Sequence, residues 1–499
     1  MTTVESLQTQ INSVISLYSN GQIQEALDSV EMLTKGYPNE PLLYNISGVC
    51  YKASGQLDVA VEYFEKALAI KPDYTEVNYN LGLTLQELGQ LDAAVESYKK
   101  ALAVNPNYAE AHNNLGVTLK ELGQLDSAVE CYEKAITTQP DYAEAHNNLG
   151  LAFYELDQVD AAVESYKKAL AIKPDYAEVN YNLGNALNDL GQLDDAVKSY
   201  EKALAIKPDY AEAHNNLGNV FKDLGQLDDA VKSYEKALAI KPDYAEAHNN
   251  LGNVFKDLGQ LDDAVKSYEK ALAIKPDYLV PQHMINALTG NTSTEPPKEY
   301  VKNLFDDYAE GFDDSLIKQL GYKLPFLMKE LILKLDPLRN KFEKVIDLGC
   351  GTGLTGIELR DISNNLTGID ISSNMVAKTR ELDVYDHLIE GDVVDILSSS
   401  KEKYDLFIAL DVFIYIGELT KMFKTVRQCC NKNALFIFSI EAQEEDGYSL
   451  LKSARYSHSE SYILKTASVA FKVIYSQEVN LRKEKEGWIK GKIFIMQAS

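Results

Sequence analysis

Proline recurs through the first half of the chain at a fixed spacing of 34 residues, from Pro38 to Pro276. Alanine keeps the same spacing from Ala26 to Ala264, and glycine keeps it from Gly82 to Gly252. A period of this length indicates a repeat array, in which each repeat is one small element that cannot bury its apolar face alone. Stacking of neighbouring repeats must therefore create the core.

Each repeat is predicted to form two amphipathic helices, with Gly-Gln-Leu-Asp at the inner turn and proline after the second helix. The period and these positions resemble the tetratricopeptide repeat. Residues 1–38 keep the spacing but lose most of the signature, as a degenerate N-terminal capping repeat does. Seven repeats and a terminal helix occupy residues 39–287, and a linker follows at 288–298. The repeat region is thus expected to be an all-α superhelix.

The second half of the chain contains a different signature, the nine residues Val345 to Gly353, which read Val-Ile-Asp-Leu-Gly-Cys-Gly-Thr-Gly. A strand that begins at Lys344 is predicted to place Asp347 at its carboxyl end. The glycines allow a sharp turn and a close approach to a ligand, and a helix from about Leu354 directs free N–H groups at it. This arrangement is suited to holding a nucleoside.

Two later motifs follow this turn: Asp370 ends the predicted strand from Leu366, and Gly-Asp-Val stands at 391–393. In this order the motifs resemble those of S-adenosylmethionine-dependent methyltransferases, over residues 299–499. The resemblance implies an α/β doubly wound seven-stranded sheet, with later strands near 433–440, 471–480 and 489–497, the last antiparallel. It implies S-adenosylmethionine as cofactor, with Asp347 at its methionine end, Asp370 at the ribose, and Asp392 and Val393 at the adenine. The implied cofactor-binding residues in the motifs are Asp347, Gly349, Cys350, Gly351, Gly353, Asp370, Ile371, Asp392 and Val393.

A dinucleotide site is the rival interpretation, because Gly351-x-Gly353-x-x-Gly356 fits the dinucleotide pattern. The ribose acid of such a site stands about twenty residues further on, whereas Asp370 follows Gly356 by fourteen. The spacing favours the methyltransferase.

An aromatic segment, residues 300–313, precedes this domain and reads Tyr-Val-Lys-Asn-Leu-Phe-Asp-Asp-Tyr-Ala-Glu-Gly-Phe-Asp. It resembles the N-terminal lid of repeat-fused methyltransferases, and the resemblance implies that Tyr308 and Phe312 contact the cofactor. The alternative is that Phe305, Tyr308 and Phe312 form an ordinary helix face that packs in the core.

Candidate catalytic residues lie after the predicted strand Tyr404–Leu410, where Asp411 and Tyr415 fall close to the expected methyl group. Methyl transfer needs alignment first, and a base only where the acceptor must lose a proton. His458 is a third candidate, as a general base at neutral pH. The alternative is that Ser457 or Ser459 caps a helix beside a solvated His458.

Composition excludes several classes. The net charge of −26 repels phosphate backbones, and the segment after Tyr404 lacks the Asn/Asp-Pro-Pro-Tyr/Phe of nucleic-acid amino methylases; we therefore expect no nucleic-acid partner. No apolar run reaches membrane-spanning length, and the N-terminus lacks a secretory signal. The five cysteines form no disulfide framework, which favours a reducing cytoplasm. No Cys/His cluster indicates a metal site.

A ladder of asparagines at the 34-residue spacing is the clue to what the repeats bind. Their amides can donate to and accept from peptide bonds, and they resemble the ladder that holds protein substrates in the O-linked N-acetylglucosamine transferase. We expect it to bind an extended peptide or protein. The ladder consists of Asn80, Asn114, Asn148, Asn182, Asn216 and Asn250.

A second ladder is acidic, and a set of tyrosines at the same spacing belongs to inter-helix packing. The alternative for both polar ladders is that they only reproduce the repeat consensus. The acids are Glu87, Glu121, Glu155, Asp189, Asp223 and Asp257, and the tyrosines are Tyr98, Tyr132, Tyr166, Tyr200 and Tyr234.

The sequence therefore predicts an S-adenosylmethionine-dependent methyltransferase whose repeats recruit a protein or peptide substrate or partner. Two alternatives remain open: a small-molecule methyltransferase that uses its repeats for assembly, and a scaffold with a vestigial nucleotide fold. The accepting atom and the oligomeric state also remain open.

Overall fold

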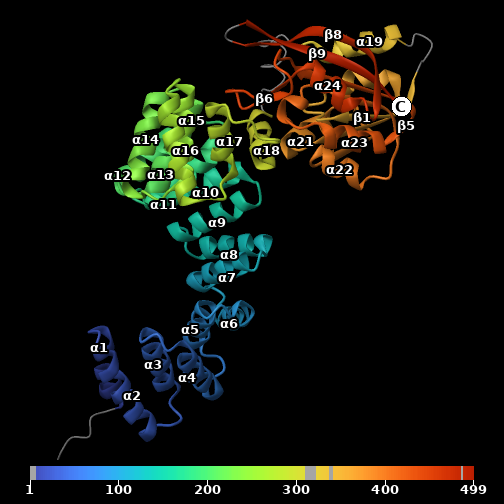
Figure 1. Cartoon of the computed structure of the whole chain (residues 1–499). Helices are drawn as coiled ribbons and strands as arrows, with labels where there is room; N and C mark the ends of the chain where they lie inside the picture. Colours follow the sequence, from blue (N-terminus) through green and yellow to red (C-terminus); the bar gives the residue numbers. More distant parts are fainter. Residues whose placement is uncertain (1–6, 310–321, 336–340, 485–486) are drawn as a thin grey trace, which may run out of the picture. The chain divides into compact units, whose positions relative to one another are not determined.

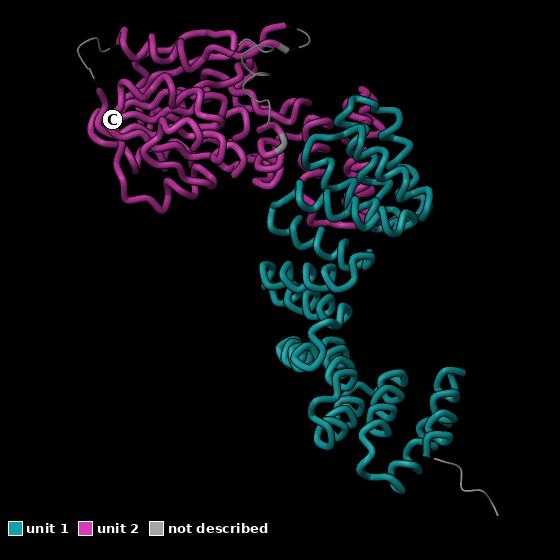
Figure 2. The backbone as a smooth tube through the Cα atoms, turned by 180° about the vertical axis from the view of Figure 1, so that it is seen from behind, with its two compact units in different colours: residues 1–242 teal, residues 243–499 magenta. Residues whose placement is uncertain are grey.

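The computed structural model describes residues 7–309, 322–335, 341–484 and 487–499 (Figure 1). The chain divides into two compact units, residues 1–242 and 243–499 (Figure 2). This division falls inside the repeat array, between two repeats of identical sequence. The sequence, by contrast, places the domain boundary at the linker.

Unit 1 consists of helices that follow one another as antiparallel pairs, one pair per repeat (Figure 1). Its helices are α1 (Leu7–Ser19), α2 (Ile23–Gly36), α3 (Pro41–Ala53), α4 (Leu57–Ile70), α5 (Thr75–Glu87), α6 (Leu91–Val104), α7 (Ala109–Glu121), α8 (Leu125–Thr138), α9 (Ala143–Glu155), α10 (Val159–Ile172), α11 (Ala177–Asp189), α12 (Leu193–Ile206), α13 (Ala211–Asp223) and α14 (Leu227–Ile240).

In six repeats a glycine on the first helix makes room for a tyrosine on the second, and in the repeat 39–72 Gly48 makes room for Phe64. A Cβ atom added at Gly82 would lie 2.7 Å from the ring of Tyr98, so only glycine allows the two helices to approach this closely. The predicted role of the repeat tyrosines in inter-helix packing is confirmed, because Tyr98, Tyr132, Tyr166, Tyr200 and Tyr234 are all buried.

The turn inside each repeat requires a left-handed residue. Gly89 has φ +73° at this position and Gly191 has φ +68°, a conformation that costs glycine little because it has no Cβ atom. Asp157 replaces glycine in one repeat and adopts φ +60°. That repeat therefore carries local backbone strain.

Unit 2 begins with the last repeat, α15 (Ala245–Asp257) and α16 (Leu261–Ile274), and continues through α17 (Leu279–Thr289), α18 (Lys298–Tyr308) and α19 (Leu324–Leu335). A seven-stranded sheet follows, in the order β3-β2-β1-β4-β5-β9-β8. Strands β1 to β5 are parallel, and β9 runs antiparallel to both β5 and β8. The expected α/β fold with an antiparallel last strand is thereby confirmed. The strands are β1 (Phe342–Leu348), β2 (Ser363–Asp370), β3 (His387–Glu390), β4 (Tyr404–Ala409), β5 (Cys430–Glu441), β8 (Phe471–Glu484) and β9 (Gly487–Ala498).

Short helices and one small hairpin connect these strands. The hairpin, β6 (Tyr448–Leu450) and β7 (Tyr456–His458), is antiparallel and separate from the main sheet. The connecting helices are α20 (Leu354–Leu359), η2 (Arg360–Ile362), α21 (Ser373–Glu381), α22 (Val393–Ser399), η3 (Phe413–Tyr415), α23 (Thr420–Gln428) and α24 (Glu460–Ala467).

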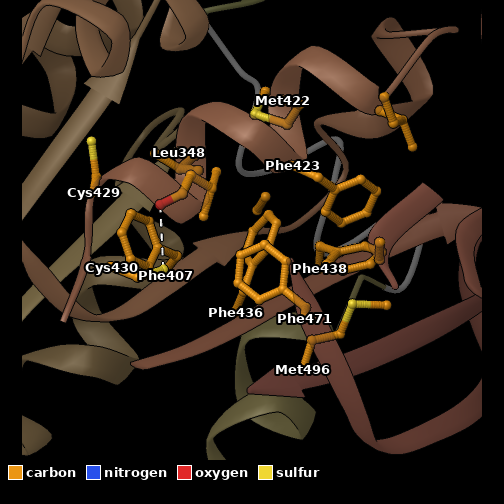
Figure 3. Close-up of a cluster of buried hydrophobic side chains, with 14 of the residues drawn as sticks. Leu348, Phe407, Met422, Phe423, Cys429, Cys430, Phe436, Phe438, Phe471 and Met496 are labelled. Atoms are coloured by element: carbon orange, nitrogen blue, oxygen red, sulfur yellow. Dashed lines mark hydrogen bonds between the residues drawn. The ribbon is translucent and has the colours of Figure 1, made fainter. Parts of the chain in front are cut away.

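Aromatic side chains fill the core between the sheet and α23 (Figure 3). Phe423, Phe436 and Phe438 are each at most 1% exposed, and their ring centroids lie 5.0–6.0 Å apart. Cys429 and Cys430 lie in the same cluster, and burial raises the pKa of the Cys430 thiol to about 12. These cysteines therefore act as buried packing residues.

The last repeat belongs to unit 2 because it packs against the hairpin. Tyr268 of α16 and Met284 of α17 are buried in one apolar cluster with Ala454 and Tyr456. The linker reinforces this junction: the backbone N–H of Leu450 donates to the Thr292 hydroxyl at 3.2 Å, and that of Glu418 donates to the carbonyl of Thr294 at 2.8 Å. The predicted linker is therefore bonded into the C-terminal domain, which explains where the chain divides.

Candidate active site

A cavity of about 640 Å³ opens at the carboxyl ends of the parallel strands in unit 2. Parallel strands bring the residues that follow them to one edge of the sheet, which is where ligands bind in folds of this kind. The predicted site residues that line the cavity are Tyr308, Gly349, Cys350, Gly351, Asp370, Ile371, Asp392, Val393, Asp411 and Tyr415.

The glycine turn and the second acid are hydrogen-bonded to each other. One carboxylate oxygen of Asp370 accepts from the backbone N–H of Gly351 at 2.8 Å, and the other accepts from the N–H of Ser372 at 2.9 Å. Gly349 has φ +74°, and a Cβ added there would lie 2.6 Å from Val412. Each carboxylate oxygen of Asp370 has a second lone pair, so the acid can still accept hydrogen bonds from hydroxyl groups.

Asp347 and Gly353 do not line the cavity, and their contact with the cofactor stays a prediction. The Asp347 carboxylate is 1% exposed and accepts a hydrogen bond from the Tyr385 hydroxyl at 2.6 Å. Burial raises the pKa of this carboxyl to about 7. Gly353 instead begins α20 with φ +93°, in a place where a Cβ would lie 2.8 Å from Leu382. Asp347 and Gly353 therefore support the glycine turn from outside the cavity.

Asp392 caps α22 at the cavity wall. Its carboxylate accepts from the backbone N–H of Asp395 at 2.9 Å and lies 3.4 Å from the Lys298 ammonium. Val393 follows it on the same wall. The predicted adenine-binding pair thus faces the cavity, at the place where the linker meets α18.

Helix α18 is held over the cavity by the turn that follows β2. Asp306 accepts a hydrogen bond from the Ser372 hydroxyl at 2.6 Å, and Ser372 also caps α21. Tyr308 lines the cavity and is 56% exposed, while Phe305 packs edge-on against Tyr415 at 5.1 Å. Tyr308 is therefore not an ordinary core residue. Phe312, the other predicted aromatic contact, lies outside the described residues.

Asp411 occupies a strained position beyond β4, with φ +55°. Its backbone N–H donates to the Ser439 hydroxyl at 2.8 Å, and its carboxylate lies 3.9 Å from the Arg482 guanidinium. Burial raises the pKa of Asp411, against the opposing effect of Arg482. Burial also raises the pKa of Tyr415 to about 12, so this phenol keeps its proton at neutral pH.

His458 does not line the cavity, and the expectation that its ring is solvated is wrong. It is 0% exposed, and its Nε2 lies 3.0 Å from the carbonyl of Gly417. Burial lowers its pKa to about 4, so the ring is neutral and enclosed rather than solvated. Ser459 caps α24, as its hydroxyl accepts from the N–H of Tyr462 at 3.1 Å.

Among the described residues, five cations line the cavity that the sequence did not predict as site residues: Lys256, Lys298, Lys421, Arg455 and Arg482. Arg482 is 4% exposed and donates to Glu441 at 2.7 Å. Arg455 stands next to Ala454 in the hairpin. No sequence motif marks these cations as site residues, because each reaches the cavity only through tertiary packing.

The asparagine ladder is half-buried and bonds neighbouring repeats together. In unit 1, each ladder amide donates to the preceding repeat at 2.9–3.2 Å. Part of its hydrogen-bonding capacity therefore stabilises the stack. The pairs are Asn80 with Asn45, Asn114 with Tyr79, Asn148 with Asn113, Asn182 with Asn147, and Asn216 with Tyr181.

Two further findings concern the described residues as a whole. No group of three or more His, Cys, Asp or Glu side chains within them is arranged to hold a metal ion. In the same part of the chain, no helix combines the length and apolar character that a membrane crossing requires.

Family models match both halves of the chain. Six overlapping segments between residues 48 and 259 match a TPR repeat, residues 245–278 match a tetratricopeptide repeat, and residues 320–467 match a methyltransferase domain. The chain therefore contains tetratricopeptide repeats followed by a methyltransferase domain.

Curated relatives match short stretches. A malonyl-[acyl-carrier protein] O-methyltransferase of Pectobacterium atrosepticum is 38% identical over 64 residues, which is 13% of this chain and 25% of that protein. A peroxisomal targeting signal receptor of Candida glabrata is 27% identical over 88 residues, 16% of this chain and 15% of that protein. The chain thus spans a quarter or less of the length of each.

Solved structures resemble the repeats. A structure of MamA is 30% identical, with a TM-score of 0.32, and covers 32% of this chain and 95% of its own. YrrB, described as a TPR protein with an unusual peptide-binding site, is 24% identical, with a TM-score of 0.35, and covers 38% of this chain and 97% of its own.

Proposed function

We propose that the protein is an S-adenosylmethionine-dependent methyltransferase whose repeats recruit a protein or peptide. The observation that carries this proposal is the meeting of the glycine turn, Asp370 and Asp392 on one cavity wall, in a domain that matches methyltransferases. When bound, S-adenosylmethionine supplies an electrophilic methyl group on a sulfonium.

The wall residues fit the parts of this cofactor. Asp370 accepts from ribose hydroxyls with lone pairs that its backbone partners leave available. Asp392 and Val393 receive the adenine, and the backbone at Gly349 and Gly351 lies against the methionine end. Tyr308 covers the cavity from α18.

The acceptor end of the cavity is formed by Asp411, Tyr415 and Arg482. Methyl transfer is an in-line displacement, so these groups chiefly orient the acceptor atom. Asp411 accepts a proton where the acceptor carries one, because it is a buried carboxyl with a raised pKa. The Tyr415 phenol donates a hydrogen bond to the methyl acceptor.

The repeats serve recruitment in this proposal. The ladder asparagines are half-buried rather than enclosed. Asn80, Asn148 and Asn182 each donate one N–H to the preceding repeat, and their amides can also donate a second N–H and accept at the carbonyl oxygen from a bound chain. The resemblance to the repeats of the O-linked N-acetylglucosamine transferase supports the same role.

Calorimetric titration of S-adenosylmethionine into the full chain tests the catalytic half of the proposal. We expect micromolar binding that Asp370→Ala weakens. If no binding were measured at millimolar S-adenosylmethionine, the alternative of a scaffold with a vestigial nucleotide fold would be favoured.

Substituting Asn148, Asn182 and Asn216 together by alanine tests recruitment. We expect a higher Michaelis constant for a polypeptide acceptor, with kcat retained. Thermal melting of the same variant measures the stacking bonds that the change also removes. Unchanged kinetics would favour a small-molecule methyltransferase.

A further inference from the structure

The asparagine ladder shares its helix face with an apolar residue and two acids. On α7 these residues stand four, three and four positions apart, a spacing that places them on one face of the helix. The same spacing holds on α5 and α9. We call this surface of α5, α7 and α9 the ladder face. It consists of Glu76, Asn80, Leu83 and Glu87 on α5, Glu110, Asn114, Val117 and Glu121 on α7, and Glu144, Asn148, Leu151 and Glu155 on α9.

Hydrogen bonds between side chains join the three helices along this face. The Asn114 amide of α7 donates to the Tyr79 hydroxyl of α5 at 2.9 Å. The Asn148 amide of α9 donates to the side-chain oxygen of Asn113 in α7 at 3.0 Å. The ladder face is therefore one continuous surface inside unit 1.

An apolar stripe runs along the ladder face. Its members, Leu83, Val117 and Leu151, are half-buried, so each packs on the core and leaves part of its side chain accessible. On α11 and α13 the same position is occupied by Asn185 and Asn219. The stripe therefore ends where the asparagines begin.

The asparagine and the apolar residue at this position bond differently. Asn185 accepts from the Tyr200 hydroxyl at 2.7 Å and from the Asn216 amide at 3.0 Å. Val117 has no side-chain acceptor, and the Tyr132 hydroxyl of its repeat is 0% exposed and has no hydrogen-bond partner within the described ranges. A buried hydroxyl without a partner costs stability. The apolar residue therefore does not serve the stack, and contact with a ligand explains its presence.

Acids flank the apolar stripe on both sides. In the part of the chain that the structure describes, only Glu87 and Glu155 of the six ladder-face acids pair with a lysine. Burial raises the pKa of Tyr79, and the charges of Glu110 and Glu144 raise it further. Acids of two neighbouring helices thus act on one aromatic ring, an arrangement that favours cationic side chains.

The spacing of the helices sets the period of a chain that follows the stripe. Packed helices lie about 8–10 Å apart, and a polyproline II chain advances about 9 Å in one turn of three residues. Every third side chain of such a chain therefore meets the next helix of the ladder face.

We propose that the ladder face binds an extended polypeptide segment in which apolar and basic side chains each recur at every third residue. Leu83, Val117 and Leu151 contact the apolar side chains, and the flanking acids bind the basic ones. The amides of Asn80 and Asn148 bond to the backbone of the segment. The inference rests on the proposed function and assigns recruitment to α5, α7 and α9.

The first experiment measures the fluorescence anisotropy of labelled twelve-residue peptides with the full chain. The probe repeats Pro-Lys-Leu, and the controls repeat Pro-Glu-Leu and Pro-Lys-Ser; proline favours the extended conformation in all three. We expect the probe to bind about tenfold more tightly than either control. Equal affinities, or no binding of the probe at millimolar concentration, would overturn the inference.

The second experiment exchanges the apolar stripe for the residue that other repeats carry. The triple variant Leu83→Asn, Val117→Asn and Leu151→Asn introduces the asparagine found at positions 185 and 219, and Val117→Asn gives the Tyr132 hydroxyl an acceptor. Circular dichroism should show a folded protein. The Pro-Lys-Leu peptide should bind about tenfold more weakly, and unchanged affinity in the folded variant would contradict the inference.

The third experiment removes charge without changing the shape of the surface. Glu110→Gln with Glu144→Gln removes two acids from the ladder face, and Glu130→Gln with Glu133→Gln removes two exposed acids from α8 as the control. We expect about threefold to tenfold weaker binding of the Pro-Lys-Leu peptide in the first pair only. Equal losses in both pairs would show that net charge alone attracts the peptide, against the inference.

Calorimetric titration of S-adenosylmethionine into the same full-length proteins separates this inference from the proposed function. Donor binding without any preference among the peptides would overturn the inference alone. Absence of donor binding in the wild type would overturn the proposed methyltransferase function.

Discussion

The carboxylate of Asp370 accepts a hydrogen bond from the backbone N–H of Gly351 at 2.8 Å, which ties the end of β2 to the turn after β1. These two motifs stand nineteen residues apart in the sequence. The bond fixes the acid before any ligand arrives, so less conformational freedom is lost when a ligand binds.

Asp370→Ala should weaken S-adenosylmethionine binding about 10- to 100-fold, because it removes charged hydrogen bonds to the ribose and loosens the glycine turn. Calorimetry on the full chain measures the effect. Asp361→Asn, a change at an exposed carboxylate whose partner is Lys329, is the control and should bind normally. If the wild type and both variants bound S-adenosylmethionine with equal affinity, Asp370 would not be a cofactor-binding residue.

The buried Asp347 should make the stability of unit 2 depend on pH. Its pKa is about 7 in the folded chain against 3.8 as the ordinary value, so the folded state holds the proton more tightly. The stabilisation is complete below pH 4 and is lost as the pH rises to about 7, with a size on the order of a few kcal/mol. Urea unfolding at pH 5 and pH 8 should show this loss in the wild type and much less in Asp347→Asn.

Tyr385→Phe provides the complementary test of the same pair. The Tyr385 hydroxyl donates to Asp347 and holds the pKa of that carboxyl lower than burial alone would. Removing the hydroxyl should therefore steepen the loss of stability with rising pH. If the stability of Tyr385→Phe depended less on pH than that of the wild type, the Tyr385 hydroxyl would not be what lowers the pKa of Asp347.

The fragment 243–499 should fold, whereas the fragment 299–499 should be less stable or aggregate. The shorter fragment loses Tyr268 and Met284 and leaves Tyr456 of the apolar junction exposed. Exposing one large buried side chain costs about 1.5–3 kcal/mol. Thermal melting and light scattering of both fragments measure the difference, and equal melting midpoints would show that the last repeat is dispensable.

Asp157→Gly should stabilise the repeat array by about 1 kcal/mol, because it relieves a left-handed residue at φ +60°. Gly191→Asp places the same residue type at φ +68° in another repeat and should have the opposite effect. Thermal melting followed by circular dichroism compares the three proteins. Shifts of the same sign would exclude backbone strain as the cause.

Much of the fold was predictable because its signals are local. The 34-residue period fixes helix pairs, and Tyr98 packs on Gly82 as the spacing requires. The four-residue strand β3 was not predicted, since its residues are all half-buried or exposed and carry no run of apolar side chains. The division between the two compact units was not predictable either, because the identical repeats that flank it carry no sequence difference.

The candidate site was predictable to the extent that strand ends define it. Asp370 and Asp392 follow parallel strands and therefore meet at one edge of the sheet. The hydrogen bond from Tyr385 to the Asp347 carboxylate was not predictable, because sequence spacing does not show which side chains meet in the folded chain. The solvated His458 was a wrong expectation, because the burial of its ring depends on residues far away in the chain.

The sequence by itself determined the repeat array, the doubly wound sheet and the strand-end residues of the site, because periodicity and strand–turn patterns act over a few neighbouring residues. Only the tertiary structure decided that the last repeat packs into the C-terminal unit and that Lys256 reaches its cavity. Lys222 and Lys256 have identical local sequences, so their different surroundings arise from what packs beyond the end of the stack.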